Sequence, residues 1–142
     1  MFTLEHQDGD IEYTIEKGGF AVIDSELYLS IETKAVKEDV FPDCFYFAVD
    51  GLPVKDCLEN SNIRIATNPN DEAPNVYVYT SFHACEVEAT VELTVISEEE
   101  IEVVLHVVSE DVNYYNEKAK PNLFKGSVKL IKKNLGEMWM PS

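Results

Sequence analysis

The sequence lacks basic residues over most of its second half. Between Arg64 and Lys118 there is no lysine or arginine, and the chain as a whole has 27 acidic and 11 basic residues, a formal net charge of −16. A potential of this sign repels phosphate groups, which argues against nucleic acid and anionic lipid as ligands. The basic-free stretch holds twelve acidic residues: Asp71, Glu72, Glu86, Glu88, Glu92, Glu98, Glu99, Glu100, Glu102, Glu110, Asp111 and Glu117.

We expect no segment in this sequence that directs the protein to or through a membrane. It has no run of about 18 apolar residues, and its first residues, MFTLEHQDGDIEY, have neither the basic nor the apolar region of a signal peptide. Its three cysteines, Cys44, Cys57 and Cys85, stand at no metal or redox spacing such as CxxC, which is typical of reduced thiols. We therefore expect a cytoplasmic protein with no membrane partner.

No catalytic or cofactor signature is present. The sequence contains no GxSxG, P-loop, dinucleotide fingerprint or HExxH motif. His83 and Cys85 have the spacing of two zinc ligands on one strand face, but no second cluster follows. The oxygen-rich stretches 8–10 and 68–72 lack the spaced ligands of a calcium loop. We expect no enzyme, metal or cofactor; an enzyme is kept as a minor alternative, marked by a pocket lined by His83, Cys85 or His106.

What the sequence does contain is the alternation of apolar and polar residues that is typical of half-buried β-strands. Turn residues such as Gly18-Gly19, Asp24-Ser25 and Asp50-Gly51 interrupt or end the pattern, and 54–62 allows at most a short helix. We predict one all-β domain over 1–142, an antiparallel sandwich or barrel-like fold of about eight strands. The candidate strands lie at 11–16, 20–23, 27–32, 44–49, 63–67, 76–82, 85–95, 101–108 and 126–133.

Residues 85–104, CEVEATVELTVISEEEIEVV, form the most acidic pair of predicted strands. Because side chains alternate across a strand, the row from Cys85 to Val95 belongs to the core, and the glutamates between these residues face water. Residues opposite each other in a hairpin share a face, so Val95 must lie opposite Ile101 or Val103. The loop between the strands then has an odd number of residues, with Glu98–Glu100 at its tip.

The acidic face has three possible roles. The last predicted strand, with Lys129, Lys132 and Lys133, could pack beside it and neutralise it. The face could instead be an interface that steers a basic partner. It could also serve only to keep a β-rich protein soluble and to discourage pairing of strand edges.

This profile, a small acidic domain with no basic residue over 65–117 and no catalytic motif, resembles the immunity proteins that bacteria make against toxins. The resemblance implies a basic partner, a cognate toxin that is often a nuclease with a positively charged cleft. The resemblance transfers no site residues, so the docking surface is assigned from the charge pattern of this sequence. In this hypothesis the surface consists of the following residues: Glu86, Glu88, Glu92 and Glu102 for the face, Glu98, Glu99 and Glu100 for the tip, and Tyr77 or Tyr79 for a central anchor.

Two further hypotheses remain open from the sequence. One is another acidic adaptor or a nucleic-acid mimic that binds a different basic protein. The other is a ligand-binding barrel, whose mark would be an empty apolar cavity.

Overall fold

The computed structural model describes residues 1–5, 9–40, 42–54, 59–66, 75–80, 83–84, 87–109 and 122–138. They form ten strands and one short 3-10 helix: β1 (Phe2–Leu4), β2 (Ile11–Ile23), β3 (Glu26–Ala35), β4 (Cys44–Pro53), β5 (Ser61–Ala66), β6 (Asn75–Thr80), β7 (His83–Ala84), β8 (Val87–Val95), β9 (Glu100–Ser109), β10 (Asn122–Ile131) and η1 (Leu135–Glu137). The all-β prediction is confirmed. The strands β1 and β7 were not predicted. The loop or short helix expected at 54–62 lies partly outside the described residues, and residues 61–62 belong to β5.

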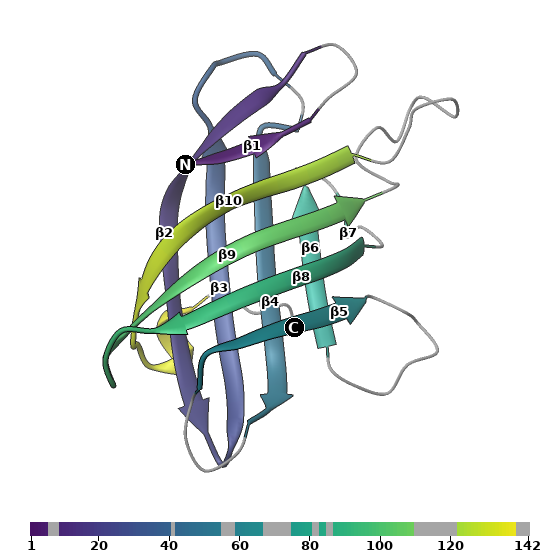
Figure 1. Cartoon of the computed structure of the whole chain (residues 1–142). Coiled ribbons are helices and arrows are strands. Elements are labelled where there is room, and N and C mark those ends of the chain that lie inside the picture. Colours follow the sequence, from purple (N-terminus) through teal and green to yellow (C-terminus); the bar gives the residue numbers. More distant parts are fainter. Residues whose placement is uncertain are drawn as a thin grey trace.

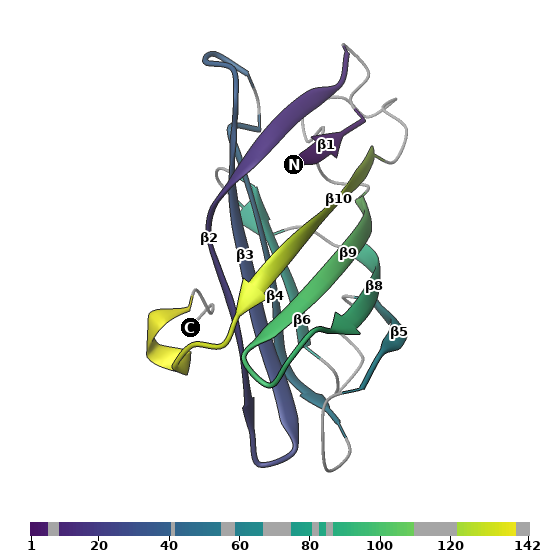
Figure 2. The same ribbon diagram turned by 60° about the vertical axis from the view of Figure 1, so that its left-hand side comes forward.

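All ten strands belong to one sheet, in the order β5-β8-β9-β10-β1-β2-β3-β4-β6-β7, and every neighbouring pair is antiparallel. The sheet curls into a half-barrel, so that β8, β9 and β10 cross in front of β2, β3 and β4 (Figure 1). A view from the side shows the two halves of the sheet facing each other (Figure 2). Their inner faces enclose the core, and their outer faces point away from each other.

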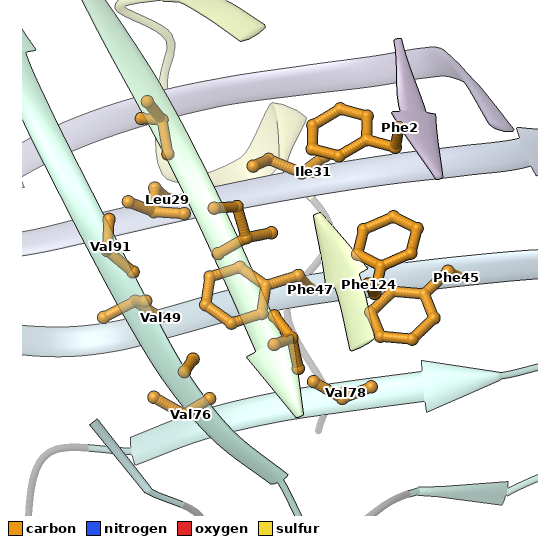
Figure 3. Close-up of a cluster of buried hydrophobic side chains, with 14 of the residues drawn as sticks. Phe2, Leu29, Ile31, Phe45, Phe47, Val49, Val76, Val78, Val91 and Phe124 are labelled. Atoms are coloured by element: carbon orange, nitrogen blue, oxygen red, sulfur yellow. The ribbon is translucent and has the colours of Figure 1, made fainter. Parts of the chain in front are cut away.

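Apolar side chains fill the space between the two halves (Figure 3). Phe124 of β10 lies between two other rings, with centroid distances of 5.2 Å to Phe2 and 3.8 Å to Phe45, and the ring of Tyr13 meets its edge at 5.6 Å. All four rings are buried. Farther along the core, Val91 of β8 and Val49 of β4 belong to the same cluster of buried side chains. These contacts join strands that are distant in sequence into one core.

The connection between β2 and β3 is the tight turn that the sequence predicted. Ile23 lies opposite Glu26, and the two residues between them, Asp24 and Ser25, have φ angles of 51° and 61°. Positive φ at both central residues matches the type I′ turn, whose twist suits a two-residue hairpin. Aspartate tolerates this conformation better than most residues.

Gly18-Gly19, by contrast, does not interrupt the strand. β2 continues through both glycines after a bulge between Ile15 and Lys17. A Cβ on Gly18 would lie 2.8 Å from Leu130 Cδ2, and one on Gly19 would lie 2.8 Å from Lys133 Cδ. The glycines therefore allow the end of β10 and the following segment to approach β2 closely, which is a tertiary requirement that the local pattern does not reveal.

Candidate functional site

The β8–β9 hairpin has the register that the apolar rows require. Val95 lies opposite Ile101, and the connection between them, 96–100, has an odd number of residues as predicted. The inner rows are buried: Ala89, Val91 and Leu93 on β8, and Ile101, Val103, Leu105 and Val107 on β9. The outer face of the hairpin therefore carries the glutamates and their polar neighbours, together with Val104 and Val108 of β9, of which Val108 is exposed.

Three of the predicted docking residues lie on this outer face. Glu88 and Glu92 of β8 are exposed, and Glu102 of β9 is half-buried beside them. Glu92 lies opposite Val104, and Glu102 opposite Thr94. Alternation therefore places the three carboxylates on one surface, as the sequence analysis expected. The fourth predicted residue, Glu86, lies outside the described residues.

The tip of the hairpin is held by backbone hydrogen bonds. The amides of Ile96 and Ser97 both donate to the carbonyl oxygen of Glu100, each at 3.0 Å, and the amide of Lys132 donates to the carbonyl oxygen of Glu99 at 2.8 Å. Glu98 and Glu99 are exposed in the loop, whereas Glu100 is half-buried as the first residue of β9. The predicted tip is thus a fixed loop tied to the chain after β10.

β10 lies beside the hairpin, as one of the hypotheses about the acidic face required. It pairs with β9 along its whole length, which puts Lys129 opposite Glu102 and Lys125 opposite His106. Side chains opposite each other in an antiparallel pair lie close enough to interact. Lys125, however, pairs with Glu5, 3.4 Å from its carboxylate, and not with an acid of the hairpin.

The acidic residues of the outer face are compensated unevenly. Glu88 forms an ion pair with Arg64 of the edge strand β5. Toward the tip, two described basic residues lie beside the glutamates. Lys129 is opposite Glu102, and the backbone amide of Lys132 donates to the carbonyl oxygen of Glu99. The negative charge of the hairpin is therefore concentrated at the tip end, on five residues: Glu92, Glu98, Glu99, Glu100 and Glu102.

Two isoleucines at the tip end are exposed, a feature that the sequence analysis missed. The exposed fraction is 48% for Ile96 and 57% for Ile131. Ile131 lies opposite Glu100, whose carbonyl accepts the amide of Ile96. The signal was present in the alternation, because Ile131 follows the buried Leu130 and must therefore face outward.

The tyrosines predicted as the central anchor lie elsewhere. Tyr77 and Tyr79 are on the outer face of β6, with Val76 and Val78 buried on the inner face as expected. β6 belongs to the half of the sheet that lies opposite β8 across the core (Figure 1). The structure therefore does not bring these tyrosines together with the acidic face.

Tyr79 is part of a different surface. Its ring lies 6.2 Å from that of Tyr46, and Tyr46 is opposite Glu32 of β3. Burial raises the pKa of Tyr46, and it also raises the pKa of Glu32, against the opposing effect of Lys17. These groups favour their neutral forms more than free side chains do.

In the described part of the chain, the histidines and cysteines that could have formed a catalytic or metal site do not come together. His106 is exposed on the outer face of β9, opposite Thr90 and Lys125. Cys44 is half-buried in β4, whereas Cys57, Cys85 and the side chain of His83 lie outside what the structure describes. Among the described residues, no group of three or more histidine, cysteine, aspartate or glutamate side chains is placed to hold a metal ion.

Comparison with protein-family models, with curated proteins and with solved structures found no match to this chain. None of the helices in the described residues is long and apolar enough to cross a membrane.

Proposed function

We propose that this protein binds and neutralises a basic protein partner through the outer face of the β8–β9 hairpin, as an immunity protein neutralises its cognate toxin. The observation that carries the proposal is the concentration of carboxylates at the tip end. Glu92 lies on β8, Glu100 and Glu102 on β9, and Glu98 and Glu99 on the connecting loop, which backbone hydrogen bonds fix. A fixed loop loses little conformational freedom on binding, so more of the interaction energy remains for affinity.

The chemistry of such a face suits a nuclease toxin. A cleft that binds phosphate presents lysine and arginine, and carboxylates can form charge-assisted hydrogen bonds with the same side chains. The hairpin and nucleic acid are both negatively charged, so they would compete for the same positively charged cleft. The attraction between the negative hairpin and the positive cleft would also accelerate their association. The partner in this proposal is a basic toxin domain whose phosphate-binding surface the hairpin covers.

The residues contribute unequally in this proposal. Glu88 is compensated by Arg64, so it adds less to the field that the partner meets. Glu92 and Glu102 have more weight because neither forms an ion pair with a described basic residue, although Lys129 lies opposite Glu102. Glu86 stays part of the hypothesis on the basis of the sequence alternation alone.

The proposal expects a basic toxin domain to be encoded beside the gene for this protein, and the test is a protection experiment with that domain. Cells that express the toxin should grow when the wild-type protein is co-expressed and should stop growing when Glu92→Lys/Glu102→Lys replaces it. The matched control is Glu12→Lys/Glu38→Lys, because it makes the same change of charge at exposed positions away from the hairpin. Equal protection by both double variants would contradict the proposed face.

A further inference from the structure

The tip end of the hairpin combines an apolar centre with a charged surround. Ile96 and Ile131, which we call the isoleucine pair, flank Glu100 and expose 48% and 57% of their surface. A single exposed isoleucine is ordinary on a protein surface. Two of them lie on either side of Glu100, at the end of the hairpin that also carries Glu98, Glu99 and Glu102. This arrangement resembles a small binding patch with a polar rim.

The isoleucine pair is held in place from both sides. The amide of Ile96 donates to Glu100, and Ile131 is the last residue of a strand whose full length pairs with β9. The adjoining end of β8 is held by Asn60, whose side-chain oxygen accepts the amide of Val95 at 2.7 Å. Apolar groups that are already fixed can contact a partner without first losing backbone freedom.

From these observations we infer that the isoleucine pair is the energetic centre of the docking surface, and that its occupant is an apolar side chain of the partner flanked by lysine or arginine. The inference rests on the proposed function and deepens it. Charge complementarity selects the occupant, because Glu98, Glu99, Glu100 and Glu102 at this end of the hairpin outnumber the neighbouring Lys129 and Lys132 and so favour cationic groups.

The two kinds of contact have separable effects. Exposed charges act over a distance on approach, so the carboxylates set the association rate and its dependence on salt. The isoleucines act only after contact, when water leaves the apolar surfaces, so they set the dissociation rate. Replacing the pair should therefore shorten the lifetime of the complex and leave the association rate almost unchanged.

The experiment uses phage-displayed random peptides of about twelve residues as the probe, selected on the full-length wild-type protein. Selected peptides are synthesised, and their binding rates are measured with wild type, Ile96→Thr/Ile131→Thr, Glu92→Lys/Glu102→Lys and the control Val36→Thr. Threonine keeps the β-branched shape that suits a strand. Val36 is a suitable control because it is 52% exposed and lies beside Glu12 at the start of β2, away from the hairpin tip.

The inference predicts peptides that combine lysine or arginine with a large apolar residue. It predicts dissociation about tenfold faster for the isoleucine variant and unchanged for Val36→Thr, with all variants folded. Cationic peptides that bind the isoleucine variant as tightly as wild type, but not the Glu92→Lys/Glu102→Lys variant, would overturn this inference and leave the proposed function standing. Peptides without cationic residues that bind all four proteins equally would contradict both.

Discussion

The ring of Phe2 lies directly against the backbone of Gly126, its partner across the β1–β10 seam. A Cβ at position 126 would be 2.5 Å from Phe2 Cδ1 and 2.5 Å from the carbonyl oxygen of Met1. Phe2 also stacks on Phe124, two residues before the glycine. The glycine thus lets β1, which joins the two halves of the sheet, lie close to β10.

We predict that Gly126→Ala lowers the free energy of unfolding by about 1–3 kcal/mol, because the new methyl group would overlap both a buried ring and a backbone atom. Urea denaturation measures the change. Gly136→Ala is the matched control, since nothing lies within 4 Å of a Cβ at that position, and its effect should stay within about 0.5 kcal/mol. Equal effects of the two substitutions would contradict the close approach at the seam.

Two hydroxyl groups on β3 should respond in opposite ways to removal. The buried hydroxyl of Thr33 donates to the carbonyl oxygen of Phe45 at 2.7 Å, whereas the buried hydroxyl of Ser30 has no hydrogen-bond partner among the described residues. Thr33→Val should cost about 1 kcal/mol in the free energy of unfolding, and Ser30→Ala should be neutral or stabilising. A larger loss for Ser30→Ala than for Thr33→Val, measured in urea, would disprove this assignment.

Tyr13 should make the protein less stable at alkaline pH. Its hydroxyl donates to the carbonyl oxygen of Pro42, and burial, helped by Cys44 and Asp43, raises its pKa well above the ordinary value of about 10. Above about pH 10 the unfolded chain loses this proton while the folded chain keeps it. The free energy of unfolding therefore falls with rising pH, by up to about 1.4 kcal/mol per pH unit from this group.

The difference between wild type and Tyr13→Phe isolates this effect, because the lysines and the other tyrosines titrate in both proteins. Urea denaturation at several pH values should show a steeper alkaline loss for wild type. The same slope in the two proteins would show that the Tyr13 hydroxyl does not stay protonated in the fold.

Arg64 should weaken the attraction of the hairpin for a basic partner. It is 77% exposed and neutralises Glu88, and an exposed pair of this kind contributes only about 0–1 kcal/mol to stability. Arg64→Gln should leave the fold intact and raise the association rate of the basic toxin domain severalfold at low salt. Lys37→Gln removes the same charge from an exposed position after β3, and a rate gain as large there would show that only net charge matters.

Local alternation was enough to predict the strand content and the inner and outer rows of the hairpin. It predicted the odd loop between Val95 and Ile101 because a shift of one residue would have turned the buried row to water. It missed β1 and β7, since strands of three and two residues are too short to show a period. It also wrongly predicted that Gly18-Gly19 would interrupt the strand. These positions are close to the side chains of Leu130 and Lys133, which are more than a hundred positions away in the sequence.

The candidate site was predictable only where its residues are neighbours in sequence. Glu88, Glu92 and Glu102 lie on one face because the hairpin is local. The position of Tyr77 and Tyr79 on the other half of the sheet depends on strand order, which periodicity does not contain. The compensation of Glu88 by Arg64 likewise requires β5 to pair with β8, a contact that the charges of the sequence alone do not specify.

The central claim is that the tip end of the hairpin attracts a basic protein. The most direct test is the association rate constant of the basic toxin domain with wild type and with Glu92→Lys/Glu102→Lys, measured from about 0.05 to 0.5 M salt. The account predicts association at least tenfold slower for the variant at low salt, and a weaker dependence on salt, with unfolding in urea unchanged. Equal association rates for two equally folded proteins would contradict it.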